Sequence, residues 1–245
     1  MISNTEETIA TDNTCTFNNI KLSLNDCNSS AQEIKKIVQE SSGNEISLSS
    51  SSCEVKLIEN FISASQCDYL IEKFSKDCID SKIESSQNTQ DVQYFNSDIK
   101  VRSSTSAYMN QCGKDVVLME ITEKVANLCN LPISHVEGLQ LVRYQKGQQY
   151  IPHHDYFKCN FKGQNRIFTV LIYLNDLEPE DGGRTIFPAL NIKVIPKTGN
   201  AVFWRNCLDD CTLLPDSLHT GEIIHRDNKI KYAVNCWIRN GPVAY

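Results

Sequence analysis

Apolar and polar residues alternate along most of the chain after Val136, and this period of two constrains the fold more than any other feature. Side chains that alternate in this way line the two faces of an extended strand. Gly, Asn, Asp and Pro residues separate the alternating segments, as expected for turns between strands. The sequence predicts eight short strands, in GLQLVRY, QYIPHHDYF, RIFTVLIYLN, RTIFP, NIKVIP, NAVFWR, SLHTG and IKYAVNCWIR.

Two amphipathic helices are predicted ahead of these strands. The segment ASQCDYLIEKFSKDC follows a predicted strand in EVKLIENFIS, has Ser65 as its expected N-cap, and turns inward Cys67, Leu70, Ile71 and Phe74. The segment KDVVLMEITEKVANLCNL places on one face Val117, Ile121, Val125 and Leu128. Eight short strands after two helices predict an α+β fold with a double-stranded β-helix, or jelly-roll, core and supporting N-terminal helices.

The composition changes sharply near residue 54. Residues 1–53 are rich in Ser, Asn, Thr and acidic side chains, which predicts a disordered polar tail. Residues 54–245 carry the apolar patterns and form the expected catalytic domain. Between Ile79 and Met109 the chain is polar and is expected to be irregular.

The charge of the chain argues against several classes of partner. A formal net charge of −6 at pH 7 offers no general attraction to nucleic acid or to an anionic membrane, and would suit a basic peptide better. The N-terminal residues lack the basic and apolar regions of a secretory signal, and no apolar run is long enough for a membrane span. We therefore expect a cytoplasmic protein, with the endoplasmic reticulum lumen as the alternative. No pattern in the sequence sets the oligomeric state.

Eleven cysteines are scattered along the chain without a C-x-x-C pair or a zinc-finger spacing. This pattern favours reduced, mostly buried thiols over a disulfide framework, although a disulfide between particular pairs is the alternative.

Two histidines and an aspartate form a candidate metal site. His153 and Asp155 lie two residues apart in QYIPHHDYF, so on a strand they point to the same side, while His154 points away. His219, in the predicted strand DSLHTG, returns beside them in a jelly-roll topology. Two histidines and one carboxylate occupy one face of an octahedral iron(II) and leave three positions open, whereas zinc prefers a tetrahedral site.

A lysine in the last predicted strand is a candidate partner for an acidic co-substrate. Lys231 shares one strand face with Ala233, Asn235 and Trp237, and an ammonium on an inward, apolar face requires a counter-charge. Lys229 has the same parity and is the alternative.

These motifs, taken in order from about Val55 to Arg239, resemble the prolyl 4-hydroxylase family of iron(II)- and 2-oxoglutarate-dependent dioxygenases. The resemblance is carried by ENFISASQCDYLIE, GLQLVRYQKGQQYIPHHDYF, RIFTVLIYLNDLEPEDGGRTIFP, GNAVFWR, DSLHTG and KYAVNCWIR. It implies a collagen-type prolyl 4-hydroxylase catalytic domain that uses Fe(2+), 2-oxoglutarate and O2, with ascorbate as reductant.

The resemblance also assigns roles to individual residues. It implies that iron is bound by His153, Asp155 and His219 and that the distal carboxylate of 2-oxoglutarate is held by Lys231. It implies that 2-oxoglutarate is also hydrogen-bonded by Tyr144 and Thr185. The place where the substrate proline enters is implied to be lined by Tyr150, Arg166 and Trp237.

The chain departs from the family pattern at two positions. The lysine usually lies ten residues after the distal histidine, which is Lys229 here, but local alignment on KYAVNCWIR selects Lys231 across a longer loop. In GGRT the chain has Arg184 where the family commonly has glutamate. We expect this change to alter the charge at the pocket mouth and the peptide preference, but not the chemistry.

The sequence therefore predicts hydroxylation of prolyl residues in a polypeptide, with release of succinate and CO2. One alternative is the same chemistry on lysyl residues, a small molecule or an alkylated nucleobase, of which the nucleobase fits the acidic charge least. A second alternative is a jelly-roll that binds a partner without catalysis. A cysteine-rich structural protein has no support in the cysteine spacing.

Overall fold

The computed structural model describes residues 14–17, 20–23, 45–48, 53–81, 101–109, 114–157 and 164–243. The chain divides into two compact units, Met1–Ser42 and Gly43–Tyr245. In the first unit β1 (Thr14–Phe17) pairs antiparallel with β2 (Ile20–Ser23). The remainder of that unit, where a disordered tail is predicted, lies outside the described residues.

The second unit begins before the boundary expected at Glu54. A short strand, β3 (Glu45–Ser47), pairs antiparallel with β4 (Val55–Ile58) and buries Ile46. Only one apolar side chain in this strand is buried, and serines flank it, so the sequence pattern does not reveal it. The expected boundary is therefore too far along the chain.

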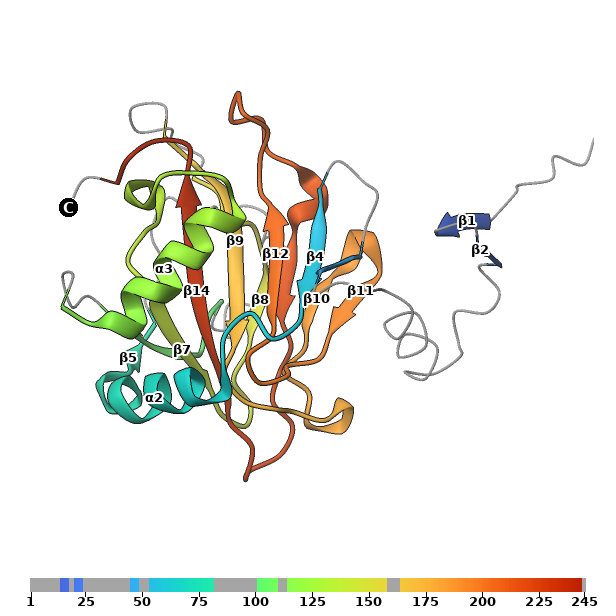
Figure 1. Cartoon of the computed structure of the whole chain (residues 1–245). Helices are drawn as coiled ribbons and strands as arrows, with labels where there is room; N and C mark the ends of the chain where they lie inside the picture. The colour runs from blue at the N-terminus through green and yellow to red at the C-terminus, as the bar shows by residue number, and fades with distance from the viewer. Residues whose placement is uncertain are drawn as a thin grey trace, which may run out of the picture. The chain divides into compact units, whose positions relative to one another are not determined.

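All eight predicted strands form (Figure 1). They are β7 (Gln140–Tyr144), β8 (Tyr150–His153), β9 (Arg166–Tyr173), β10 (Thr185–Phe187), β11 (Ile192–Val194), β12 (Ala201–Arg205), β13 (His219–Gly221) and β14 (Lys231–Arg239). Two further strands, β5 (Ile79–Asp80) and β6 (Thr105–Tyr108), lie in the segment expected to be irregular. They form because β6 pairs with β7 and β5 pairs with β6.

The strands of the second unit form two antiparallel sheets. The large sheet has the order β3-β4-β12-β9-β14-β7-β6-β5, and the small sheet has the order β11-β10-β13-β8. The two sheets enclose one hydrophobic core, to which both contribute apolar side chains. This arrangement confirms the predicted jelly-roll.

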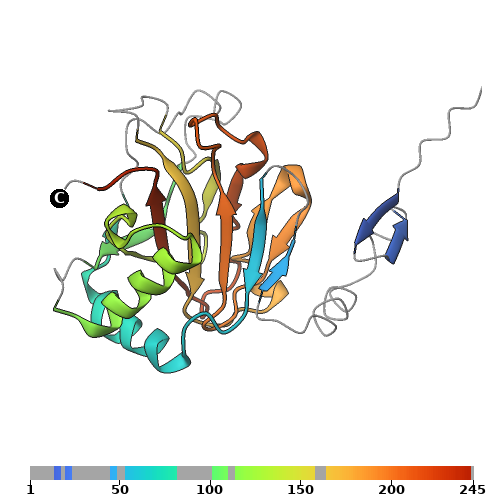
Figure 2. The ribbon, with the colours of Figure 1, turned by 45° about the horizontal axis from the view of Figure 1, so that its top comes forward.

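Two helices cover the other face of the large sheet (Figure 2). They are α2 (Ala64–Phe74) and α3 (Val116–Leu128). The N-cap of α2 is Ser63 rather than Ser65, because Ser63 and Gln66 form a reciprocal capping box and Ser65 already lies in the first turn. The short 3-10 helices of the described residues are η2 (Ser75–Asp77), η4 (Ile133–His135), η6 (Pro179–Asp181), η7 (Pro188–Leu190) and η8 (Pro215–Ser217).

The central strand β9 shows how the period of two positions the site. Val170 and Ile172 point to the core beneath the helices, whereas Leu171 and Tyr173 point to the core between the sheets. The same alternation on β14 turns Lys231, Ala233, Asn235 and Trp237 toward a pocket between the sheets. No helix within the described residues is both long and apolar enough to cross a membrane.

Candidate active site

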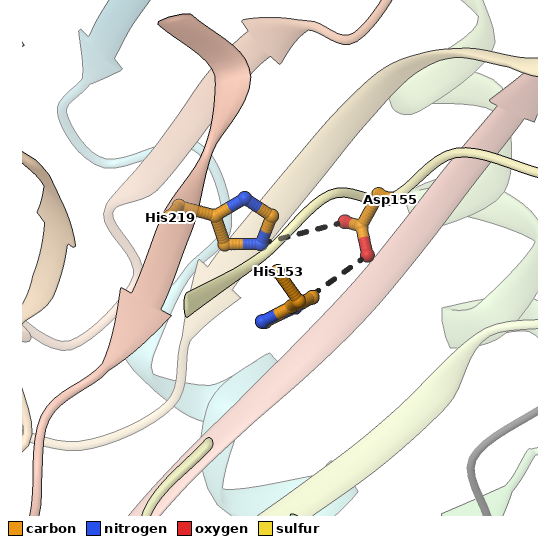
Figure 3. Close-up of side chains that lie close together, drawn as sticks. All are labelled: His153, Asp155 and His219. Atoms are coloured by element: carbon orange, nitrogen blue, oxygen red, sulfur yellow. Dashed lines mark ion pairs between the residues drawn. The ribbon is translucent and has the colours of Figure 1, made fainter. Parts of the chain in front are cut away.

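The predicted metal ligands meet at one end of the small sheet (Figure 3). His153 ends β8 and His219 begins β13, and these two residues are direct cross-strand partners. Asp155 lies in a bend just beyond β8 rather than on the strand, yet its carboxylate still points toward both histidines. One ligand atom of each of the three residues lies within 4.8 Å of the others.

Hydrogen bonds fix the orientation of both imidazole rings. The Nδ1 atom of His153 lies 2.9 Å from the carbonyl of Ile151, and the Nδ1 atom of His219 lies 2.9 Å from the carbonyl of Ser217. A carbonyl accepts, so each Nδ1 carries the proton and each Nε2 keeps its lone pair. Each Nε2 atom lies 3.8 Å from an oxygen of Asp155, so all three donors surround one point.

The protonation states of His153 and Asp155 suit a metal ligand set. Burial, followed by the neighbouring His219, holds the pKa of His153 well below its usual value, so the ring is neutral. Burial alone would raise the pKa of Asp155, but electrostatic interactions with His219, His153 and Arg166 lower it overall. The set therefore includes a neutral imidazole at His153 and a carboxylate at Asp155.

A buried hydrogen-bond chain supports the carboxylate. The hydroxyl of Thr169 donates to Oδ2 of Asp155 at 3.0 Å, and the amide of Asn206 donates to the Thr169 hydroxyl at 2.9 Å. Thr169 and Asn206 are completely buried. Partners of this kind hold ligands in place and tune metal affinity.

A pocket extends from the three ligands to a buried lysine. Lys231 is 3% exposed, lines this pocket, and lies beside the rings of Tyr144 and Tyr173. Burial lowers its pKa to about 7, with a partly opposing effect from Glu222. Lys229 does not line the pocket, since its ammonium pairs with Asp181 at 3.0 Å. Of the two candidate lysines, Lys231 is therefore the one that lines the pocket, and its role in binding 2-oxoglutarate stays a prediction.

Two hydroxyl groups predicted to bind 2-oxoglutarate also line the pocket. Tyr173 donates a hydrogen bond to the Thr185 hydroxyl at 2.7 Å, which leaves the proton of Thr185 for an acceptor in the pocket. Tyr144 is the cross-strand partner of Lys231, so both side chains approach the same space.

The three residues predicted to contact the substrate proline differ in their placement. Tyr150 and Trp237 line the pocket, and the Tyr150 ring stacks on His153 with a centroid separation of 3.4 Å. Arg166 lies behind Trp237, with its guanidinium 3.7 Å from the centre of the indole ring. It forms two hydrogen bonds with Glu137, of 2.8 and 2.7 Å, and does not line the pocket. The substrate roles of all three stay predictions.

Sequence reasoning missed a polar group beside the pocket. Arg102 is buried, lies 5.0 Å from the Tyr150 ring centre, and donates to Ser104 and Gln140. Gln140 also accepts from Asn235, which lines the pocket. A buried arginine with no carboxylate partner among the described residues would indicate a functional role. The burial of Arg102 can be seen only once the fold is known, so the sequence alone did not reveal it.

The donor set fits iron(II). Three ligands gathered on one side leave the positions facing the pocket open, and Lys231 lines the same pocket. A structural zinc site would need a fourth protein ligand, and the described residues supply no such group beside these three.

Comparisons with known proteins agree with this geometry. The sequence profile of the 2OG-Fe(II) oxygenase superfamily matches residues 139–239. An Arabidopsis thaliana protein named "Probable prolyl 4-hydroxylase 3" is 33% identical over 192 residues, which cover 69% of this chain and 64% of the relative. A protein of Acanthamoeba polyphaga mimivirus named "Putative prolyl 4-hydroxylase" is 31% identical, over 75% of this chain and 73% of the relative. The chain spans less than two thirds of the length of that Arabidopsis relative.

Solved structures are also similar. The viral collagen prolyl hydroxylase vCPH of Paramecium Bursaria Chlorella virus-1, in its 2OG complex, matches with a TM-score of 0.61 and 26% identity. The match covers 76% of this chain and 96% of the viral one. A Pseudomonas putida prolyl-4-hydroxylase shares the fold, with a TM-score of 0.52 and 16% identity, over 76% of this chain and 92% of that chain.

Proposed function

The chain belongs to the prolyl 4-hydroxylase family of iron(II)- and 2-oxoglutarate-dependent oxygenases, and we propose that it hydroxylates prolyl residues of a polypeptide at the 4-position. The observation that carries the proposal is one pocket that is lined both by the donors His153, Asp155 and His219 and by the buried Lys231. When bound, iron(II) with 2-oxoglutarate and O2 supplies the oxidation of a C–H bond, with release of succinate and CO2.

The residues of the pocket bind and orient the co-substrate in this proposal. Lys231 pairs with the distal carboxylate, because its buried ammonium lines the pocket and forms no ion pair within the part of the chain that the structure describes. Thr185 donates its free proton to the same carboxylate. The proximal carboxylate and keto oxygen then face the three metal ligands.

The peptide side of the proposal rests on aromatic side chains. Tyr150 and Trp237 line the pocket beside the metal ligands and would hold a pyrrolidine ring between flat apolar surfaces. Arg166 and Glu137 fix the Trp237 ring from behind, because the guanidinium stacks on the indole and is itself held by the carboxylate. This arrangement would orient the ring and exclude water from it.

The proposal is tested with the full chain, iron(II), 2-oxoglutarate and ascorbate, together with proline-rich peptides. We expect a gain of one oxygen on proline, matched by formation of one succinate per hydroxylation, as read by mass spectrometry. Peptides with lysine in place of the target proline test the same chemistry on lysyl residues. Oxidation of lysine instead of proline would redirect the proposal, and oxidation of neither with any peptide would contradict it.

A matched pair of histidine variants controls the assay. His153→Ala removes a metal ligand and should abolish both iron binding and turnover. His154→Gln changes the adjacent histidine, whose Nδ1 contacts Ser217 at 3.0 Å and which is not a ligand, so it should retain both. Iron binding that survives in His153→Ala would contradict the ligand assignment.

A further inference from the structure

Arg184 and Glu222 form an ion pair beside the pocket, each next in the chain to a residue that lines it, Thr185 and Gly221. Thr185 and Gly221 are cross-strand partners on β10 and β13, and Arg184 faces Glu222 one position further along. The Nε atom of Arg184 donates to Glu222 at 2.6 Å, and a second guanidinium nitrogen donates to its other oxygen. The backbone N–H of Arg184 also donates to Glu222, at 3.2 Å. Both side chains are partly buried, with 27% and 16% of their surface exposed.

Glu222 lies close enough to Lys231 for its charge to matter there. Among the charged side chains of the described residues, Glu222 is the one whose field raises the pKa of Lys231. The two residues do not form an ion pair with each other. Both carboxylate oxygens of Glu222 are instead held by Arg184. Burial alone would raise the pKa of Glu222, but the hydrogen bonds and charge of Arg184 lower it overall. His225 contributes to the same lowering.

We propose that Arg184 is a positioning residue for 2-oxoglutarate: it holds and neutralises Glu222, so that the Lys231 ammonium stays available to the distal carboxylate of the co-substrate. The inference rests on the co-substrate of the proposed function and not on its peptide. Arg184 stands where the family commonly has glutamate, and the sequence predicts that this change alters peptide preference. The inference adds an effect of the same residue on co-substrate binding.

The physical reason is competition between two carboxylates for one cation. A largely buried carboxylate such as Glu222 acts over several ångströms, because little water screens it. Without Arg184, Glu222 would lose the ion pair that neutralises it and would still act on the nearby Lys231 ammonium. Glu222 would then either pair with Lys231 or repel the incoming dianion, and each outcome weakens 2-oxoglutarate binding.

The test is calorimetric titration of 2-oxoglutarate into the full chain loaded with manganese(II), a metal that accepts the same nitrogen and oxygen ligands. No peptide or turnover is needed. The variants are Arg184→Ala, Glu222→Gln, the double variant Arg184→Ala with Glu222→Ala, and Lys197→Ala as a control. Lys197 forms an exposed ion pair with Glu178 at 3.2 Å and does not line the pocket. Manganese affinity and Tm are measured for each variant.

We expect Arg184→Ala to raise the Kd for 2-oxoglutarate by about tenfold or more, equivalent to about 1.4 kcal/mol. Manganese affinity should not change. Glu222→Gln should bind 2-oxoglutarate at least as tightly as the wild type, since it removes the competing carboxylate. The Kd of the double variant should return to within roughly threefold of the wild-type value. Two residues that neutralise each other are energetically coupled, so removing both should cost less than removing Arg184 alone. Lys197→Ala should behave as the wild type.

Three results would overturn the inference. Unchanged affinity in Arg184→Ala is the first, and failure of the double variant to recover is the second. Weaker binding in Glu222→Gln, with its fold intact by Tm, is the third, because it would give Glu222 a favourable role. If the wild type binds no 2-oxoglutarate, both this inference and the assignment of 2-oxoglutarate as co-substrate would be contradicted. Conversely, the expected binding pattern without peptide oxidation would contradict the proposed function alone.

Discussion

The buried Lys231 ammonium makes the pocket sensitive to pH near neutrality. Its pKa of about 7 means that it is charged below neutral pH and increasingly neutral above it. Because 2-oxoglutarate pairs with the charged form, we expect affinity to be constant below pH 7 and to fall by up to about tenfold per pH unit above it. Calorimetry between pH 6 and 9 should also show proton uptake on binding above pH 7. An affinity that is independent of pH would contradict this account.

The same residue makes a prediction about stability. The pKa of Lys231 is lower in the folded chain than in the unfolded chain, where it is about 10.4. The unfolded state therefore binds more protons between these values, and stability rises with pH through that window. At or below pH 7 the full cost of burying the charge is present. Lys231→Met should consequently raise the Tm of the ligand-free protein most at low pH, while abolishing 2-oxoglutarate binding.

The hydroxyl of Thr169 carries a prediction about metal affinity. Thr169→Val keeps the side-chain shape but removes the donor to Asp155 and the acceptor for Asn206. Loss of such a partner typically weakens metal binding by roughly 10- to 100-fold. Competition with a chelator should show this loss in the variant. Thr220→Val is a control, because its hydroxyl donates to the Tyr150 carbonyl and not to a ligand. Equal losses in both variants would assign the effect to general disturbance of the small sheet.

The candidate metal ligands and Lys231 could be predicted from the sequence, because each stands out by its residue type within a short segment. His153 and Asp155 are two residues apart, and Lys231 is a charge on an apolar strand face. Thr169 and Asn206 could not be predicted, since a threonine in a strand and an asparagine after one are ordinary. Their roles depend on contacts with residues far away in the chain, and so does the stacking of Arg102 on Tyr150.

Among the elements, strands were predicted where one face of the strand is apolar and buried. β9 and β14 have that pattern and lie at the centre of the large sheet. β3 and β5 do not, because β3 buries a single residue and both residues of β5 are exposed. They are short strands at the two edges of the large sheet, held mainly by backbone hydrogen bonds to one neighbour.

Helix α3 supplies packing rather than chemistry. Ile121 is fully buried in the core between the helices and the large sheet. Ile121→Ala should therefore lower the free energy of unfolding by roughly 2–5 kcal/mol. Denaturant titration measures this change, and the Kd for 2-oxoglutarate should stay as in the wild type. The exposed Met119 on the same helix offers Met119→Ala as a control with little effect. A weakened Kd in Ile121→Ala alone would mean that the helix layer positions the pocket.

For the whole molecule, the division at Gly43 predicts where the chain can be shortened. Met1–Ser42 forms a separate compact unit, whereas β3 lies within the second one and pairs with β4. A chain that begins at Gly43 should keep the Tm of the full chain within a few degrees. A chain that begins at Glu54 loses Ile46 and the buried Cys53 and leaves the edge of β4 unpaired.

The chain that begins at Glu54 should therefore have a measurably lower Tm than the chain that begins at Gly43. Complete burial of one large aliphatic side chain contributes about 1.5–3 kcal/mol, and each kcal/mol shifts Tm by about 2–4 °C in a domain of this size. Calorimetry on both chains, with and without 2-oxoglutarate and manganese(II), distinguishes a change in the stability of the fold from a change in co-substrate binding. Because β3 is remote in the sheet order from β14, which carries Lys231, the Kd for 2-oxoglutarate should be the same in both. Equal Tm values would instead place the start of the stable unit at Glu54, as the composition alone suggests.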